Sequence, residues 1–194
     1  MEKKYILTEE AKEIGGHILH RIQAMRDFGG VQKGDLGGWV ESEENLSHDG
    51  TCWVSGDGRV FDNGRVFGDG RVSDNGWVFG DGKVFGNGEV FDNGKVYGNG
   101  RVSDDGRVFG NAKIGFNAYI SSPRSYFVQG PIGSRDDFLT CYLDKDKKIY
   151  AVTGCFCGSI EVFVKKVKAV HGMNRWAKQY LKAAEMARVM LSGD

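Results

Sequence analysis

The sequence predicts a mostly β protein whose body is a three-sided parallel solenoid, and three observations predict it. An aliphatic residue returns at every sixth position from Val54 to Ile120. Between these positions the unit reads like Val60-Phe61-Asp62-Asn63-Gly64-Arg65, and Gly, Asp and Asn tolerate the left-handed backbone region that a corner needs. Glycine is abundant at 30 residues while proline is rare at 2, which suits a repeat with one obligatory glycine per unit.

The hexad determines the cross-section of this body. Side chains alternate in an extended segment, so if Val60 points inward, Arg59 and Phe61 point outward. Gly58 then faces the interior near a corner, where only a small side chain fits. Three sides close a triangle, so about eighteen residues make one coil, coils stack at about 4.8 Å, and backbone groups pair with the coils above and below.

The amino-terminal segment is expected to form a small β-unit that leads into the solenoid. Residues 5–28 predict a hairpin, because the Gly15-Gly16 pair separates two apolar runs. The coil is expected to begin near Val40, since Leu46 follows six residues later. A two-residue insertion before Val54 then breaks the phase.

The carboxyl-terminal segment is expected to be an α+β module that caps the open end of the solenoid. Ser122-Pro123 ends the repeat. The predicted elements are strands at 126–129, 138–143 and 149–153, a helix capped by Ser159 and Gly172, and a second helix from Asn174 past Leu191. The predicted domains are therefore an N-terminal β cap over 1–39, the solenoid over 40–122 and the C-terminal module over 123–194.

The repeated Val-x-x-Asn-Gly-x units over 54–120 resemble the hexapeptide repeat of left-handed β-helices. That resemblance implies a left-handed parallel β-helix. Hexapeptide acyltransferases, which use coenzyme A, are the best-known owners of this helix, and their catalytic histidine works near a loop extruded from a coil. This repeat has neither such a loop nor a histidine, and His48, just before the main coil, is the candidate nearest to it.

The flanking segments resemble another group of proteins. The stretch Leu36-Gly37-Gly38-Trp39-Val40-Glu41-Ser42-Glu43, the turn Gly130 to Arg135, and Gly154-Cys155-Phe156 leading to His171-Gly172 are similar to bacteriophage and prophage proteins labelled polymer-forming or hexapeptide-repeat proteins. This resemblance implies a phage or prophage accessory factor, and it brings no settled activity.

Charge and cysteine content suggest the setting. Lys plus Arg equals Asp plus Glu at 26 each, so no general attraction to nucleic acid or membrane is expected, although residues 123–194 carry 12 basic and 7 acidic side chains. Four cysteines do not make a disulfide framework in a chain of this length. No apolar leader or membrane span is evident, so we expect a cytoplasmic protein, in the host cell if it is phage-encoded.

The outward aromatic residues fall into three predicted columns, one on each face of the triangle. They are Phe61, Phe79 and Tyr97 with Trp77 beside them, Phe67 with Phe85, and Phe91 with Phe109. Such rings can cover one another between coils. The first column is also large enough to be a self-association surface, as a dimer or trimer through Phe61, Trp77, Phe79 and Tyr97. The corner aspartates alternate with arginines, so solvated corners are expected rather than a metal site.

The turn from Gly130 to Arg135 is the candidate ligand site. Gly130, Gly133, Ser134 and Arg135 combine backbone N–H groups, a hydroxyl and a guanidinium, a set suited to a phosphate or carboxylate. Tyr126 or Phe156 is expected to stack on a base, and His171 is included in the site. The alternative is a turn that simply needs its glycines, because the Gly-Lys-Ser/Thr ending of a phosphate-binding loop is absent.

The cysteines suggest other chemistry that we do not favour. Cys155 with His171 as base is a conceivable nucleophile pair, but no third orienting group is visible, and a buried structural Cys155 is expected instead. Zinc is not expected, because Cys155-x-Cys157 on a strand points its sulfurs to opposite faces. No catalytic residue, metal or cofactor is assigned.

Three functions remain open from the sequence. The first is an oligomeric binding protein without enzymatic activity, which acts against host defence by sequestering an anionic, nucleotide-like ligand or by blocking a host protein. The second is a structural, polymer-forming or virion-associated β-helix. The third is a hexapeptide acyltransferase that uses coenzyme A.

Overall fold

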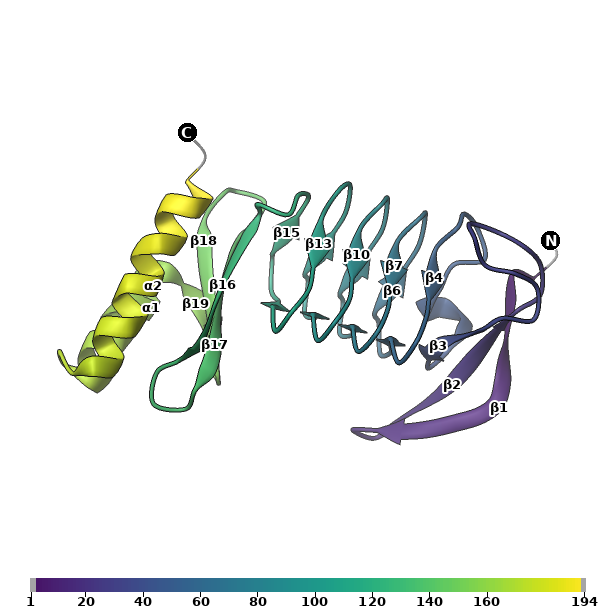
Figure 1. Ribbon diagram of the computed structural model, residues 1–194, viewed down its shortest axis with the longest axis horizontal. Helices are drawn as coiled ribbons and strands as arrows, with labels where there is room; N and C mark the ends of the chain where they lie inside the picture. The colour runs from purple at the N-terminus through teal and green to yellow at the C-terminus, as the bar shows by residue number, and fades with distance from the viewer. Residues whose placement is uncertain (1–2, 193–194) are drawn as a thin grey trace.

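A computed structural model describes residues 3–192 and shows a β-solenoid between an N-terminal hairpin and a C-terminal α+β module (Figure 1). The fold class predicted from the sequence is therefore confirmed. Residues 1–2 and 193–194, which fall in the outer two predicted domains, lie outside the described residues. Within 3–192 no helix is long and apolar enough to cross a membrane.

The N-terminal hairpin forms as predicted and joins the solenoid edge to edge. Strands β1 (Tyr5–Ile14) and β2 (His17–Ala24) pair antiparallel around Gly15 and Gly16, both of which have positive φ. Strand β3 (Leu36–Val40) pairs antiparallel with β2 and parallel with β5 (Arg59–Val60). One sheet therefore runs from the hairpin into the first face of the solenoid.

The solenoid repeats every eighteen residues on three faces. Each short strand pairs in parallel with the strand one coil away, so that Val60 aligns with Val78 and Val78 with Val96. The remaining strands are β4 (Trp53–Val54), β6 (Arg65–Val66), β7 (Arg71–Val72), β8 (Trp77–Val78), β9 (Lys83–Val84), β10 (Glu89–Val90), β11 (Lys95–Val96), β12 (Arg101–Val102), β13 (Arg107–Val108), β14 (Lys113–Ile114) and β15 (Tyr119–Ile120). The triangular coil predicted from the hexad is confirmed.

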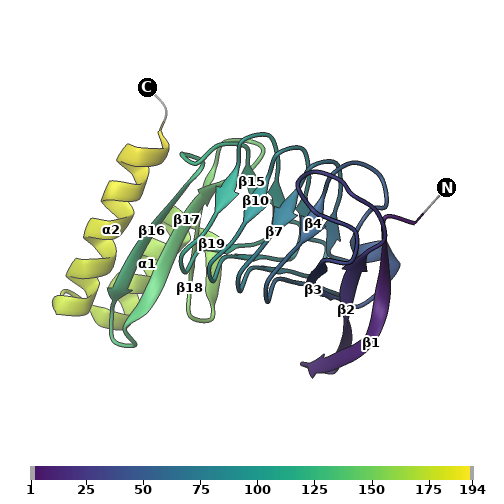
Figure 2. The same ribbon diagram turned by 45° about the vertical axis from the view of Figure 1, so that its right-hand side comes forward.

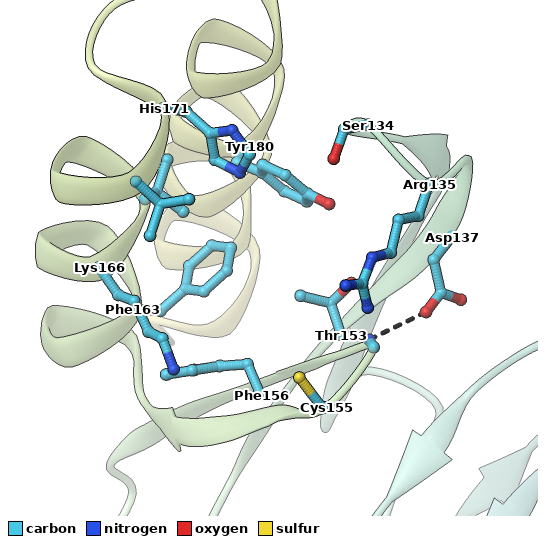
Figure 3. Close-up of a pocket in the computed structure, with 13 residues that line it drawn as sticks. Ser134, Arg135, Asp137, Thr153, Cys155, Phe156, Phe163, Lys166, His171 and Tyr180 are labelled. Carbon is cyan, nitrogen blue, oxygen red and sulfur yellow. Dashed lines mark hydrogen bonds between the residues drawn. The ribbon is translucent and has the colours of Figure 1, made fainter.

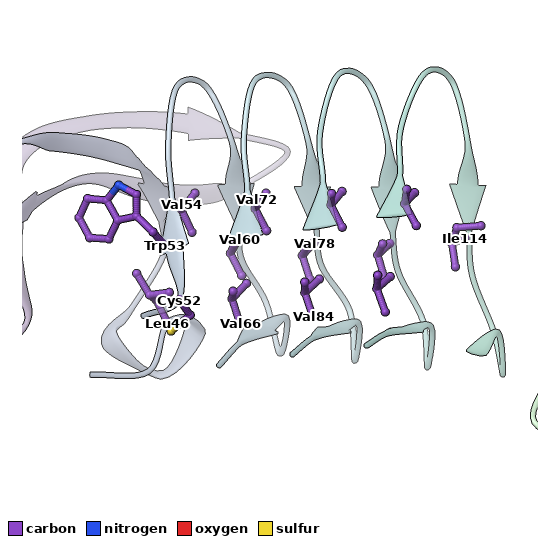
Figure 4. Close-up of a cluster of buried hydrophobic side chains, with 14 of the residues drawn as sticks. Leu46, Cys52, Trp53, Val54, Val60, Val66, Val72, Val78, Val84 and Ile114 are labelled. Atoms are coloured by element: carbon purple, nitrogen blue, oxygen red, sulfur yellow. The ribbon is translucent and has the colours of Figure 1, made fainter. Parts of the chain in front are cut away.

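The core is a column of branched aliphatic side chains enclosed by the coils (Figure 4). The valines from Val54 to Val108 are almost fully buried, at no more than 1% exposed. The inward glycines leave room for the next coil, since a Cβ at Gly88 would lie 2.7 Å from the carbonyl oxygen of Val102. The interior is therefore narrow at its corners, as the repeat predicts.

The corners use the left-handed backbone region, and this explains the Asp and Gly that follow each aromatic position. Asp62, Asp74, Asp92 and Asp104 have φ of 56°, 53°, 52° and 52°. Glycine takes the equivalent place in other hexads. Glycine and aspartate adopt positive φ at a lower conformational energy than most other residues. The chain can therefore turn every six residues.

The C-terminal module is a four-stranded antiparallel sheet with two helices on the side away from the solenoid (Figure 2). The sheet contains β16 (Tyr126–Ile132), β17 (Asp137–Leu143), β18 (Ile149–Thr153) and β19 (Phe156–Ser159). The helices are α1 (Ile160–His171) and α2 (Arg175–Leu191). One face of the sheet contributes Tyr142 and Val152 to the solenoid core, while Leu139 and Ala151 pack with the helices.

Candidate functional site

A pocket of about 300 Å³ lies in the C-terminal module, between the β16–β17 turn, the β18–β19 turn and helix α1 (Figure 3). Ser134 and Arg135 come from the first turn, and Thr153, Cys155 and Phe156 come from the second. The helices supply Phe163, Lys166, Val167, Val170, His171 and Tyr180. An apolar wall of aromatic and aliphatic side chains thus faces a small number of polar and charged groups, which is the usual composition of a ligand site.

Helix α1 is placed by its two ends. The Ser159 hydroxyl accepts from the backbone N–H of Val162 (3.4 Å), and Gly172 ends the helix at φ 57° with its N–H bonded to Lys168 O (2.9 Å). This register buries Phe163 and Val167 against the sheet and α2. Lys166 follows Phe163 by three residues, so the helical period turns it toward the same pocket.

The pocket has a surplus of positive charge. Within residues 3–192, neither Arg135 nor Lys166 forms an ion pair. Asp137 also borders the pocket, but its carboxylate accepts from the N–H of Gly154 (2.9 Å) and from Lys113 Nζ (3.4 Å). Two cations are therefore left without a neutralising partner beside an apolar wall, an arrangement that favours an anionic ligand.

Asp137 borders the pocket as a charged carboxylate. Burial acts to raise the pKa of Asp137, but hydrogen bonds from the N–H groups of Phe138 and Gly154 and the charge of Lys113 outweigh it and lower the pKa. The hydrogen bond from the Gly154 N–H to the Asp137 carboxylate holds the β18–β19 turn next to Arg135. Asp137 therefore positions the turn that carries Cys155 and Phe156.

Four of the predicted site residues come together in this pocket. They are Ser134, Arg135, Phe156 and His171. In Figure 3 the Arg135 guanidinium, the Ser134 hydroxyl and the His171 ring all face the space above Phe156 and Phe163. Residues far apart in the sequence thus form one surface.

The two predicted glycines, Gly130 and Gly133, have packing roles, and neither lines the pocket. The N–H of Gly133 donates to Gln179 Oε1 (2.9 Å), so it is already satisfied. A Cβ at Gly133 would collide with the Tyr180 phenol, and a Cβ at Gly130 would collide with the Phe138 ring. Gly130 thus allows close packing within the β16–β17 hairpin, and Gly133 allows close packing of its turn on α2. The Gly133 N–H is not available to an anion, which corrects its predicted role as a backbone donor.

Tyr126 lies outside this pocket, so it is not placed to stack on a ligand bound there. Its ring packs edge-on against Phe109 at 6.2 Å, and its hydroxyl accepts from the N–H of Phe109 (3.3 Å). Burial raises the pKa of the Tyr126 hydroxyl. Tyr126 joins β16 to the last coils of the solenoid, while Tyr180 of α2 occupies the place in the pocket that the sequence analysis gave to Tyr126.

The structure places Cys155 and His171 on opposite sides of the pocket. Cys155 is exposed, so the prediction that it is buried is wrong. Figure 3 shows Cys155 beside Phe156, whereas His171 lies across the pocket near Tyr180. No hydrogen bond joins Cys155 to His171. Within residues 3–192, no group of three or more potential metal ligands forms.

Lys166, Thr153 and Tyr180 are pocket residues that the sequence analysis missed. Lys166 had a usable signal, because it shares a helical face with Phe163 and Val170 of the predicted helix. Tyr180 had none, since its approach depends on how α2 packs on α1. The phenol of Tyr180 meets Phe163 edge-on at 5.7 Å and lies 6.0 Å from the His171 ring.

The proposed self-association column is partly covered within the chain itself. The rings stack as predicted, with centroids 5.2 Å apart for Phe61 and Phe79 and 5.4 Å apart for Phe79 and Tyr97. Phe61, however, is only 7% exposed, because it packs with Leu19 of the hairpin and with Trp39. Phe61 is therefore unavailable to a second subunit, and association through the rest of the column stays a prediction.

His48 is held in a structural arrangement and not in an open catalytic one. Its ring stacks on Tyr5 at 4.3 Å, its Nδ1 accepts from the Lys4 backbone N–H (3.2 Å), and its Nε2 faces Glu43 at 3.5 Å. The nitrogen that would take a proton already accepts a hydrogen bond. His48 is therefore a poor general base.

Comparison with known proteins finds no family model that matches the chain and finds a partial similarity to an acetyltransferase-named protein. Over 72 residues the chain is 31% identical to the protein named "uncharacterized acetyltransferase YdcK" of Escherichia coli (strain K12). That match covers 33% of this chain and 22% of the relative, so the chain spans less than a quarter of the relative's length.

This match corrects one of the expectations from the sequence. The relative is named an acetyltransferase, and the hexapeptide solenoid is typical of acyltransferases, so the expectation of a protein without enzymatic activity is contradicted. The acyltransferase alternative gains support. Nothing in the comparison concerns a phage origin or a role against host defence, and these stay predictions.

Proposed function

We propose that the protein is an acyltransferase that draws its acyl group from a nucleotide-bearing thioester such as acetyl coenzyme A, and that the C-terminal pocket holds the nucleotide part of this donor. The observation that carries the proposal is the pairing of two free cations, Arg135 and Lys166, with an aromatic wall in one cavity. The solenoid and the partial similarity to a protein named as an acetyltransferase support the reaction class.

The pocket fits such a donor in size and chemistry. About 300 Å³ is at the lower end of the range for small-molecule sites, enough for a nucleotide portion with the rest of the donor outside. The planar fork of Arg135 and the ammonium of Lys166 suit phosphate oxygens. The half-buried Phe156 offers flat apolar surface to a base, with Lys166 Nζ 5.3 Å from the centre of its ring.

Acyl transfer also requires that the acceptor lose a proton. The acceptor's hydroxyl or amine attacks the thioester carbonyl, its proton passes to a base, and the thiol of the donor leaves. His171 is the imidazole of this pocket, and its ring faces the cavity at the end of α1 (Figure 3). We assign His171 the role of proton acceptor within this proposal.

The test is turnover of acetyl coenzyme A in the presence of a mixture of hydroxyl and amine acceptors. Turnover is measured as the release of free coenzyme A thiol. Arg135→Ala is expected to raise KM for the donor by about 10-fold or more, because a charge-assisted contact contributes roughly 1.5–3 kcal/mol. Arg124→Ala removes an exposed arginine elsewhere in the same module and is expected to leave KM unchanged.

Two results would count against this assignment. One is the absence of donor turnover by the wild-type protein with every acceptor class. The other is an equal rise of KM for the donor in Arg124→Ala and Arg135→Ala. A donor bound in the pocket is expected to respond to Arg135 and not to Arg124. His171→Gln, which keeps a hydrogen-bonding side chain of similar length, is expected to lower kcat with little change in KM.

A further inference from the structure

The N-terminal cap contains a buried lysine in contact with a buried cysteine, far from the pocket. Lys4 and Cys52 are both 0% exposed. Lys4 Nζ lies 3.1 Å from Cys52 Sγ, and it also donates to the carbonyl oxygens of Cys52 (2.9 Å) and Asp49 (3.4 Å). Lysine is almost never fully buried unless it is paired, and this one has a thiol where a carboxylate would be expected.

The surroundings of the pair fix its geometry. The ammonium sits over the Phe28 ring at 5.1 Å, and within residues 3–192 it forms no ion pair. The thiol can donate to the carbonyl oxygen of Ser47 (3.4 Å), which leaves a sulfur lone pair directed at the Lys4 nitrogen. Nitrogen and sulfur are therefore held in line for reaction.

We propose that Lys4 and Cys52 form a reversible covalent bridge in which one oxygen atom joins the lysine nitrogen to the cysteine sulfur under oxidising conditions. The oxidant is hydrogen peroxide. One peroxide molecule converts the thiol to a sulfenic acid and leaves as one water. The Lys4 ammonium gives one proton to solvent and becomes a neutral amine. A second peroxide then removes one hydrogen from this nitrogen and one from the sulfenic oxygen as the N–O bond forms, and leaves as two waters. Nitrogen and sulfur are oxidised, and peroxide oxygen is reduced.

The alternatives fit the site less well. A disulfide within the chain is excluded by position, because Cys141, Cys155 and Cys157 all lie in the C-terminal module at the other end of the solenoid (Figure 1). A direct nitrogen–sulfur bond requires a much closer approach than the observed separation, whereas an inserted oxygen spans it with little movement. Burial raises the pKa of the Cys52 thiol, while the Lys4 ammonium opposes this, so proximity and not an acidic thiol makes the pair reactive.

The bridge would connect two segments that close the amino-terminal end of the solenoid. Lys4 directly precedes β1, and Cys52 directly precedes β4, at a sequence separation of 48. A cross-link over a loop of this length restricts the unfolded chain as a disulfide does. Oxidation is therefore expected to raise Tm by more than about 5 °C. The proposal does not depend on the function of the C-terminal pocket.

The test is mass spectrometry of the intact, full-length protein before and after treatment with hydrogen peroxide. The expected product is heavier by about 14 Da, one oxygen gained and two hydrogens lost, and returns to the starting mass with dithiothreitol. Trypsin is expected to stop cutting after Lys4 in the oxidised protein, and the peptide that contains Lys4 is expected to be joined to the one that contains Cys52.

Variants separate the bridge from ordinary thiol oxidation. Cys52→Ser, which keeps a hydroxyl in place of the thiol, is expected to abolish the product, and Cys155→Ser, which removes the exposed thiol, is expected to leave it intact. If Cys52→Ser fails to fold, peptide mapping of the wild-type protein still decides. The proposal is overturned if Cys52 gains oxygen without the loss of two hydrogens while trypsin still cuts after Lys4. It is also overturned if Cys52 does not react.

Discussion

Gly88→Ala is expected to destabilise the protein by about 2–3 kcal/mol, measured as the shift of the urea unfolding midpoint. A Cβ at this position would lie 2.7 Å from the carbonyl oxygen and 2.9 Å from the carbonyl carbon of Val102, in the next coil. These are backbone atoms, so they cannot move without opening the stack. The φ of Gly88 is not positive, so alanine meets no conformational barrier there, and the cost comes from the contact between coils.

Ala112→Gly is the matched control for Gly88→Ala. Ala112 and Ala118 occupy the same place in their hexads as Gly88, and alanine is tolerated there because no further coil follows. Ala112→Gly is expected to lower the free energy of unfolding by no more than about 1 kcal/mol, because glycine gives the unfolded chain more conformational freedom. If Gly88→Ala proves as mild as Ala112→Gly, the interior is wider than the structure shows.

Asn45→Asp is expected to cost about 3–5 kcal/mol at neutral pH. Asn45 is 2% exposed, and its Nδ2 donates to the carbonyl oxygens of Asp62 and Gly64, both at 2.9 Å. Its Oδ1 accepts from the Ser42 N–H (2.8 Å), so the side chain joins the segment between β3 and β4 to the corner at Asp62 to Gly64. The aspartate would replace two donors with a buried carboxylate that faces two carbonyl oxygens.

The pH dependence of Asn45→Asp gives a second and independent readout. Burial next to carbonyl oxygens would raise the pKa of the new carboxyl, so the folded state binds its proton more tightly than the unfolded state does. The stability lost at neutral pH is therefore regained as the pH falls. Asn93→Asp, at an exposed corner between Asn75 and Asn111 of the neighbouring coils, is expected to be nearly neutral and to show no such recovery. A parallel pH response in both variants would contradict the structural role of Asn45.

The solenoid was predictable because each step of its argument is local. A six-residue period assigns every residue to the interior, the surface or a corner, and the coil closes after three periods whatever lies outside it. The columns of Phe67 with Phe85 and of Phe91 with Phe109 follow from that register, and their rings are parallel within 1° and 11°. The Gly15-Gly16 hairpin was predictable for the same reason.

The coverage of the solenoid faces was not predictable, because it depends on where the caps dock. The hairpin folds over Phe61, and the hydroxyl of Tyr126 reaches the backbone of Phe109, through contacts between segments far apart in the sequence. Neither contact leaves a periodic signal. A glycine-rich turn likewise does not reveal whether its N–H groups are free, and Gln179 of a distant helix takes the one at Gly133.

The candidate site was predictable in part. A basic C-terminal third, an Arg135 turn and an aromatic at Phe156 indicated an anion site, and the structure adds Lys166 and Tyr180 from the helices. The sequence offered an acyltransferase only as an alternative, because the repeat lacks the histidine that the acyltransferase resemblance implies. His171 enters the pocket only through the packing of α1 on the sheet.

The central claim, that the C-terminal pocket binds a nucleotide-bearing acyl donor, is tested most directly by calorimetric titration of coenzyme A into the purified protein. Lys166→Ala is expected to weaken binding by about 10-fold or more, while Lys165→Ala, which removes an exposed neighbouring charge on the same helix, is expected to leave it unchanged. No heat of binding in the wild-type protein, or the same loss in both variants, would contradict the claim.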